Sequence, residues 1–176
     1  MPELSKRRLV LLRHASAESR PAGMDDRDRR LTAKGRGELA TTSRHLRALN
    51  FSPDRVIISD ARRALETWDA LSTTFEEEEK PIIEESLYLA PPATILSLVQ
   101  TLGGDAQALL VIGHNPGLTS LAQSLAGQES DPTALAALSQ GLAPSAFACL
   151  QGSLANWSDL TPRGARLVHC GDRPIR

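Results

Sequence analysis

The chain has 176 residues, of which 41% are hydrophobic, and a formal net charge of −1 at pH 7. This length and composition fit one globular domain with an apolar core, so we expect residues 1–176 to form a single domain. The near-neutral charge argues against a nucleic-acid-binding surface, and no apolar run approaches the roughly 18–20 residues that cross a bilayer. The first residues do not resemble a signal peptide, and two cysteines, Cys149 and Cys170, provide no disulfide framework. We therefore expect a cytoplasmic protein with neither nucleic acid nor membrane as a partner.

Three short apolar runs predict buried parallel strands, because they lack the polar alternation of a half-exposed strand. They are residues 9–12, 56–58 and 109–112. Weaker strand candidates follow at residues 145–150 and 166–170.

Four stretches with apolar residues at helical spacing accompany these strands. They are residues 32–50, 61–75, 92–102 and 116–127. The first is predicted to begin with Thr32 as its N-cap and to stop at Asn50, and the last two carry a proline near their start. Residues 127–142 predict a helix-plus-loop excursion, and the acidic run at 76–79 predicts a solvated loop.

The order of strand, helix, strand and helix predicts an α/β fold. We expect a three-layer α/β/α sandwich with a mostly parallel central sheet and right-handed crossovers. In an open sheet of this kind, ligands bind at the carboxyl ends of the strands. The residues that follow the first three strands are therefore the candidate site.

Each of these three strands brings cationic or imidazole side chains to that edge of the sheet. Arg13 and His14 follow the first strand. Arg62 and Arg63 open the helix after the second strand, and His114 lies at the turn after the third. Arginines are unfavourable at a helix N-terminus unless an anion is bound there, and "NPG" after His114 adds backbone N–H groups that favour an anion. Together these residues predict a pocket for a phosphate-like dianion that contains two imidazoles.

Such a pocket suits phosphoryl transfer. Arginine binds phosphate through a planar, permanently charged fork. A neutral imidazole can attack phosphorus and form a phosphohistidine that water then hydrolyses, while a second, protonated imidazole donates a hydrogen bond to the phosphoryl group. This chemistry needs no metal, and no cluster of metal-ligating residue types at ligand spacing accompanies the site. We therefore expect neither a metal ion nor another cofactor.

Four ordered motifs, "LLRHASAE", "LTAKG", "SDARRALET" and "VIGHNPG", resemble those of the histidine phosphatase superfamily, which includes phosphoglycerate mutases and acid phosphatases. The short chain and this motif set resemble its small phosphohistidine phosphatase branch, the SixA type. The resemblance implies a phosphoglycerate mutase-like fold, with His14 as the nucleophile and His114 as the second catalytic histidine. It also implies that Arg13, Arg63 and His114 bind the phosphoryl group. The family arginine is the fourth residue after the serine of its motif, which selects Arg63 over Arg62.

The resemblance covers roughly residues 8–118, and the sequence departs from the family pattern at two places. Many members have glycine after the nucleophilic histidine, whereas this chain has Ala15. Members that cleave phosphate esters commonly carry a general-acid carboxylate after the third strand of the family's own fold. The matching stretch "SLYLAPP" has none, and Glu84 and Glu85 lie just upstream. An alkoxide leaving group needs protonation, but imidazole leaves readily because its conjugate acid has a pKa of about 6.5. The missing acid therefore favours phosphohistidine of a protein, as in a phosphorelay, over a phosphate ester.

Two alternatives stay open. The same residues could serve a metal-independent phosphomonoesterase that acts on a small phosphorylated metabolite. From a different class, the domain could be a non-catalytic phosphate-binding interaction module. Mutase activity is less favoured, because the chain lacks both the acid and the insertions of larger mutases.

Other patterns are interpreted as coincidence or as surface features. The C-terminal "HCGDRPIR" matches the pattern of cysteine phosphatases, but Pro174 interrupts the helix that such a loop must enter. A zinc site formed by His14, His114, His169 and a cysteine lacks the close spacing typical of zinc ligands. The charged loop at residues 16–30 is expected to border the pocket.

Overall fold

The computed structural model describes residues 4–75 and 80–171 of the chain. Within these residues the strands are β1 (Ser5–Arg13), β2 (Arg55–Ser59), β3 (Ile82–Glu84), β4 (Ala108–Gly113), β5 (Phe147–Leu154) and β6 (Arg166–Gly171). The helices are α1 (Ala33–Ala48), α2 (Arg62–Ser72), α3 (Pro92–Leu102), α4 (Gly117–Leu125) and α5 (Pro132–Ser139). Three short 3-10 turns are η1 (Asp26–Asp28), η2 (Glu85–Leu87) and η3 (Trp157–Asp159).

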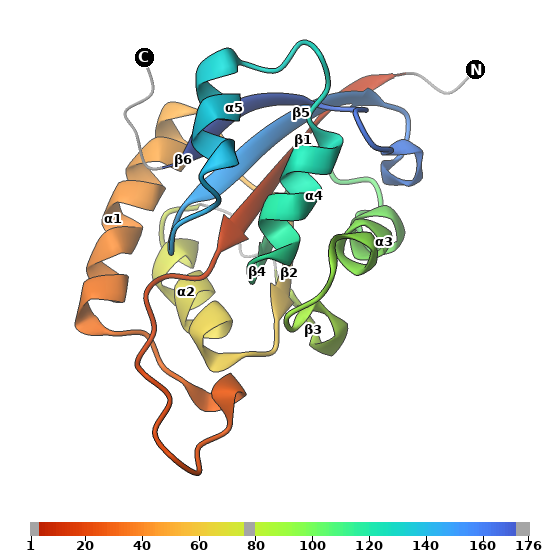
Figure 1. Ribbon diagram of the computed structural model, residues 1–176. Helices are drawn as coiled ribbons and strands as arrows, with labels where there is room; N and C mark the ends of the chain where they lie inside the picture. Colours follow the sequence, from red (N-terminus) through yellow and green to blue (C-terminus); the bar gives the residue numbers. More distant parts are fainter. Residues whose placement is uncertain (1–3, 76–79, 172–176) are drawn as a thin grey trace.

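The strands form a single sheet in the order β3-β2-β4-β1-β5-β6 (Figure 1). β3, β2, β4 and β1 are mutually parallel, whereas β5 runs antiparallel to both β1 and β6. The register between β1 and β4 places Arg13 opposite Gly113, so these two strands end level with each other. The predicted mostly parallel sheet is confirmed, with β5 as its reversed strand.

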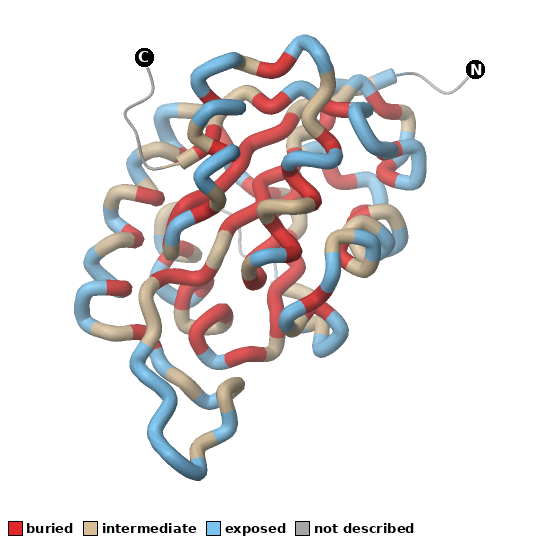
Figure 2. The backbone as a smooth tube through the Cα atoms, in the orientation of Figure 1, coloured by how far each residue is buried: buried red, intermediate tan, exposed pale blue. Residues whose placement is uncertain are grey.

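The alternating side chains of β1 show how the sheet separates two apolar layers. Leu9 and Leu11 pack into the core beneath α3, α4 and α5. Val10 and Leu12 point the other way, into the core beneath α1 and α2. All four side chains are almost fully buried, as expected for a central strand covered on both faces. The predicted three-layer sandwich is therefore confirmed, with the buried residues concentrated along the sheet (Figure 2).

All four predicted helices are present, three of them with shifts at their ends. α3 has the predicted bounds, and the Oγ1 of Thr32 caps α1 by accepting a hydrogen bond from the N–H of Gly35 at 2.9 Å. Asn50 ends this helical segment with a positive φ of 49°, a backbone conformation that asparagine tolerates well. α2 ends at Ser72, earlier than predicted, and α5 is the helix of the predicted excursion at 127–142.

The largest differences from the sequence-based strand predictions concern β5, β1 and β3. β5 begins at Phe147, not at residue 145, because Ser145 has a φ of 62° and belongs to the preceding turn. β1 is longer than its apolar run, and β3 was not predicted at all. β3 has three residues at the edge of the sheet, too few to give a periodic pattern.

Some predictions fall outside the described residues. The acidic run at 76–79 and most of the "HCGDRPIR" stretch, residues 172–176, belong to this group. In the remainder of the chain, no helix combines the length and apolar character required to span a bilayer.

The carboxyl ends of β1, β2 and β4 lie side by side, because β4 pairs with both of the others. The connection from β1 to α1 projects beyond this edge as a long loop (Figure 1). An isolated bridge between Ala17 and Leu31 joins the two sides of the loop at its base. The sheet edge and this loop define the candidate site.

Candidate active site

His14 lies directly after β1 and is buried, with 8% of its surface exposed. Its backbone N–H donates to the carbonyl of Gly113 at 3.1 Å, which fixes it to the end of β4. Its Nδ1 lies 2.8 Å from the carbonyl oxygen of Ala15. Since a carbonyl only accepts, Nδ1 carries the proton and Nε2 keeps its lone pair. Burial, with a smaller contribution from the charges of Arg63 and Arg13, lowers the pKa of His14 to about 4, although the hydrogen bond to Ala15 opposes the shift. His14 is therefore neutral at pH 7, the state that a nucleophilic imidazole requires.

Arg63, the second residue of α2, connects the two imidazoles. Its side chain is 1% exposed, its Nε donates to Nε2 of His14 at 3.1 Å, and its Nη2 lies 3.3 Å from Nδ1 of His114. Arg62 points away from this cluster and donates to the carboxylate of Glu66 at 3.1 Å. The structure thus places Arg63, and not Arg62, beside the histidines.

His114 follows β4, with its ring centroid 5.1 Å from that of His14. Because a guanidinium only donates, the Nδ1 of His114 facing Arg63 is an acceptor, and its Nε2–H donates to Oγ of Ser59 at 2.8 Å. Burial lowers the pKa of His114 to about 3, helped by His14 and the charge of Arg63. His114 is therefore neutral in this arrangement, and its expected protonation beside a phosphoryl group stays a prediction. The carboxylate of Asp26 raises the pKa of this ring, but burial, His14 and the charges of Arg63 and Arg29 outweigh it.

Arg13, the last residue of β1, lies partly exposed at the rim. Its Nη1 donates to the carbonyl of Leu142 at 2.9 Å, and burial lowers its pKa from an ordinary arginine value. The four predicted site residues, Arg13, His14, Arg63 and His114, all border one cavity of about 590 Å³. Its other lining residues are Ser16, Ala17, Arg20, Asp26, Arg29, Tyr88, Leu89, Asn115 and Pro144.

A carboxylate that the sequence analysis missed enters this cavity from the loop at residues 16–30. Oδ2 of Asp26 accepts from Nη2 of Arg63 at 3.0 Å and from the hydroxyl of Tyr88 at 2.7 Å. Oδ1 accepts from Nε of Arg29 at 2.8 Å. Burial raises the pKa of Asp26, but the hydrogen bond from Tyr88 and the charges of Arg63 and Arg29 outweigh it and hold the pKa at about 2. Asp26 is thus firmly ionised.

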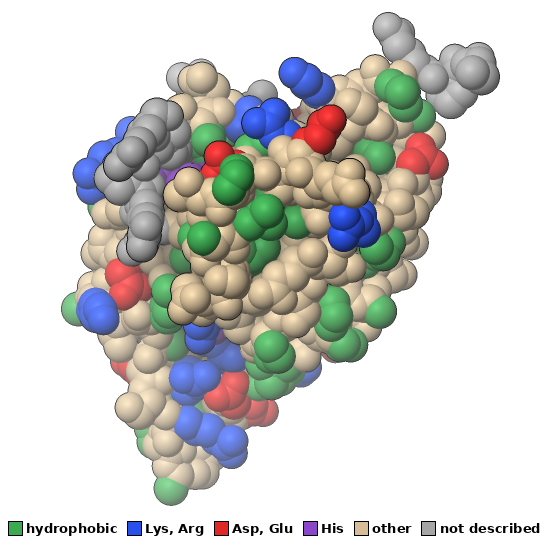
Figure 3. Space-filling view, turned by 45° about the horizontal axis from the view of Figure 1, so that its top comes forward, with side chains coloured by type: hydrophobic (Ala, Val, Ile, Leu, Met, Phe, Trp, Pro, Cys, Tyr) green, Lys and Arg blue, Asp and Glu red, His purple; other side chains and the backbone are tan. Residues whose placement is uncertain are grey.

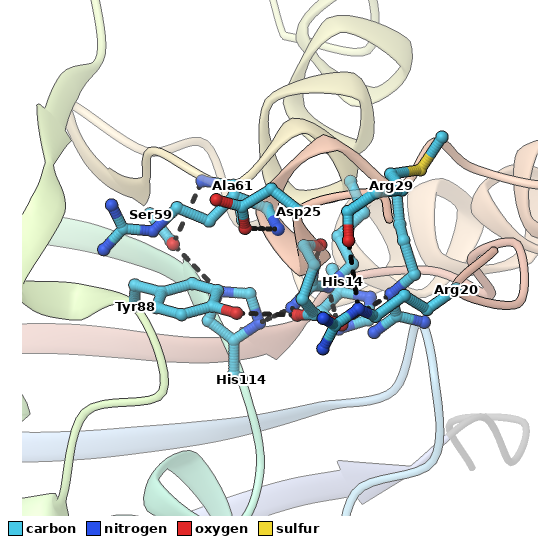
Figure 4. Close-up of polar contacts among 12 residues, drawn as sticks. His14, Arg20, Asp25, Arg29, Ser59, Ala61, Tyr88 and His114 are labelled. Atoms are coloured by element: carbon cyan, nitrogen blue, oxygen red, sulfur yellow. Dashed lines mark hydrogen bonds and ion pairs between the residues drawn. The ribbon is translucent and has the colours of Figure 1, made fainter. Parts of the chain in front are cut away.

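Tyr88 occupies the stretch "SLYLAPP", where the family pattern led us to look for an acid. Its ring meets the ring of His114 edge-on, with centroids 5.3 Å apart, and the side chains of His14, His114 and Tyr88 converge (Figure 4). Burial and the neighbouring carboxylate of Asp26 raise the pKa of Tyr88, so its hydroxyl keeps its proton. Glu84, in contrast, does not line the cavity, and its side chain accepts hydrogen bonds from Ser86.

The alternative histidine and cysteine sites do not assemble. His169 packs against Phe147 and His45, away from the cavity. Burial raises the pKa of the Cys170 thiol to about 11, which disfavours a reactive thiolate, and Arg176 lies outside the described residues. Within residues 4–75 and 80–171, no group of three His, Cys, Asp or Glu side chains could hold a metal ion.

Comparisons with known proteins bear on the family and the fold of the chain. The family model of the histidine phosphatase superfamily (branch 1) matches residues 9–88. An uncharacterized protein of Mycobacterium tuberculosis is 32% identical over 158 residues, which cover 89% of this chain and 96% of the relative.

Two solved structures that resemble most of the chain are described as "putative phosphohistidine phosphatase SixA". The structure from Nakamurella multipartitia has a TM-score of 0.80 and 29% identity, covering 98% of both chains. That from Agrobacterium tumefaciens has a TM-score of 0.75 and 26% identity, covering 93% of this chain and 97% of the other.

The chain therefore belongs to the histidine phosphatase superfamily, as the order of its four motifs predicted. Within that superfamily it falls in the SixA-type branch and has the phosphoglycerate mutase-like fold. It is thus a phosphatase, a hydrolase that acts on phosphorylated substrates.

Proposed function

We propose that this phosphatase removes phosphate from phosphohistidine of a protein, through a covalent intermediate on His14 and without a metal ion. The observation that carries the proposal is the state of Asp26. Among the described residues that line the cavity, it has the only carboxylate, and two arginines keep it ionised. An ionised carboxylate cannot protonate an alkoxide, whereas a departing imidazole takes its proton from water near neutral pH.

The proposed reaction has two displacements at phosphorus. In the first, Nε2 of His14 forms a bond to phosphorus while the bond to the substrate imidazole nitrogen breaks, and the departing imidazole gains a proton. In the second, water attacks the phosphorylated His14, a proton passes to the surroundings, and inorganic phosphate leaves with the ring restored. Arg13, Arg63 and His114, which takes up a proton beside the phosphoryl dianion, hold the phosphoryl oxygens, whose charge must be stabilised in both steps.

A small phosphorylated metabolite is the second candidate substrate. The cavity of about 590 Å³ is large enough for one, since small-molecule sites commonly have about 300–1,000 Å³. The SixA assignments of the two similar structures favour the protein substrate.

Trapping the intermediate tests the mechanism. Full-length protein is mixed briefly with a radioactively phosphorylated phosphohistidine protein, denatured in base and examined for label that acid removes. We expect label on the unmodified chain and on His45→Ala, a histidine of α1 outside the cavity, and none on His14→Ala. A chain that turns over substrate without ever carrying label would contradict the covalent step.

A substrate panel tests the specificity. We expect activity on the phosphohistidine protein to exceed that on alkyl phosphates, with para-nitrophenyl phosphate in between because its leaving group is more acidic. Addition of a chelator should leave the rates unchanged. Efficient hydrolysis of alkyl phosphates without activity on phosphohistidine would assign the second candidate, and a chain that binds phosphate without hydrolysing any substrate would be an interaction module.

A further inference from the structure

The guanidinium of Arg63 is already surrounded by acceptors from the protein. Besides His14 and His114, it donates twice to Asp26, from Nη1 to the backbone carbonyl at 2.7 Å and from Nη2 to the carboxylate at 3.0 Å. A phosphoryl group in front of Nε2 of His14 needs these same N–H groups. It cannot use them fully while Asp26 holds them.

The carboxylate of Asp26 accepts hydrogen bonds from the donor groups that a bound phosphate would also need. One oxygen accepts from Arg63 and Tyr88, and the other accepts from Arg29, so a single anion bridges two arginines. A phosphoryl dianion and an ionised carboxylate at the same guanidinium repel each other strongly, because the surrounding site is partly buried. The two anions are therefore alternatives at this position.

We propose that Asp26 is an internal competitor for the phosphoryl site: its carboxylate occupies Arg63 and Arg29, leaves when an oxyanion binds, and returns to displace the product phosphate. The idea that the Asp26 carboxylate leaves and returns during each turnover rests on the proposed function. The competition itself concerns only anion binding, and it can be measured without any substrate.

The segment that carries Asp26 can move without disturbing the core. η1 has no buried residue, so little apolar surface opposes its displacement. What holds it are polar contacts, such as the ion pair between Arg27 and Asp60 at 3.3 Å. On the face that Figure 3 shows, basic side chains (Lys or Arg) lie next to acidic ones (Asp or Glu) at the lower end of the molecule.

Competition of this kind makes a quantitative prediction. A protein whose binding-competent state is only partly populated binds every ligand more weakly by the same factor. Removing the charge of Asp26 should therefore strengthen the binding of chemically different oxyanions equally. A residue that contacted the bound anion would instead affect each anion differently.

The test compares Asp26→Asn with Asp28→Asn in the full-length chain. Asp28 belongs to the same turn and is exposed, and within the described residues its carboxylate makes no hydrogen bond or ion pair. Calorimetry with inorganic phosphate and with tungstate measures the affinity. We expect Asp26→Asn to lower both dissociation constants by a common factor of roughly three to ten, as expected when one charged contact is removed. Asp28→Asn should leave both unchanged, and for Asp26→Asn the KM for substrate should decrease.

Unchanged or weaker anion binding by Asp26→Asn would overturn the proposal and make Asp26 a residue that positions the arginines. If this variant is poorly folded, a structure of the unmodified chain with tungstate decides the question. Movement of the Asp26 carboxylate away from Arg63 supports competition, and a carboxylate that stays at 3.0 Å beside bound tungstate overturns it. Failure of the proposed function would look different, because the anion affinities would still change although no substrate is hydrolysed.

Discussion

Arg62 and Arg63 are adjacent in the sequence but lie in opposite environments. Arg63 is buried against both imidazoles, whereas Arg62 is exposed and forms an ion pair with Glu66 along the surface of α2. The pair therefore offers a matched comparison in which one guanidinium belongs to the site and its neighbour does not.

We expect Arg63→Lys to lower kcat/KM about 10²–10³-fold, because lysine keeps the charge but loses the fork that reaches two acceptors at once. Arg62→Lys should stay within about twofold, since an exposed ion pair contributes little. Steady-state kinetics with para-nitrophenyl phosphate measures both, and thermal unfolding checks that each variant is folded. A loss below tenfold for Arg63→Lys would show that charge alone suffices there.

How far the site could be predicted differs from residue to residue. Arg13, His14 and His114 were predicted because they lie at or just after the end of a strand whose apolar run is visible in the sequence, and strand ends converge in this fold. Asp26 and Tyr88 were missed as site residues. Their positions depend on the path of a long loop and of a short turn, and neither has a periodic signal. The charged stretch in the loop was the one available hint.

At the scale of elements, α1 fixes the loop that carries Asp26 through a close approach at Gly35. A Cβ atom at this position would lie 2.1 Å from the carbonyl oxygen of Ser16, where the loop leaves the sheet. Gly37, two residues further along the same helix, has nothing within 4 Å of such an atom. Only the first glycine is required by packing.

We expect Gly35→Ala to lower the free energy of unfolding by about 1–3 kcal/mol, because backbone must shift to admit the methyl group. Gly37→Ala should raise it by up to about 1 kcal/mol, because alanine favours the helix without a clash. Urea unfolding followed by circular dichroism measures both changes. Equal effects of the two substitutions would mean that the backbone at Ser16 can shift to admit the methyl group without loss of stability.

The elements themselves followed largely from sequence pattern. α3 was predicted residue for residue because a proline starts it and its apolar positions repeat regularly. β5 was placed too early because alanine and serine at 145–146 carry no signal that distinguishes a turn from a strand. The antiparallel direction of β5 depends on its pairing with β1, which is a long-range contact that local pattern does not encode.

At the scale of the whole molecule, the fold holds two imidazoles neutral where three strands end. His14 and His114 have their pKa lowered to about 4 and about 3, first by burial and then by the surrounding positive groups. An exposed histidine has a pKa of about 6.5, so the unfolded chain binds protons in a range where the folded chain does not. Stability must then fall as the pH falls from about 6.5 toward 4, and must be independent of these groups above about 7.

We therefore expect the free energy of unfolding to decrease between pH 6 and pH 5 by up to about 1.4 kcal/mol per pH unit for each imidazole. Urea titrations at intervals of pH measure this slope for the unmodified chain and for the double variant His14→Gln/His114→Gln. The difference between the two slopes is the contribution of His14 and His114 to the pH dependence. Carboxylates and the other histidines, including the half-buried His169, contribute equally to the slopes of the two proteins. Saturating phosphate should reduce the slope of the unmodified chain alone, since a bound dianion beside the rings favours their protonation in the folded state. Identical slopes in the two proteins would mean that the imidazoles take up protons in the folded chain as readily as in water, and the neutral nucleophile inferred for His14 would then be wrong.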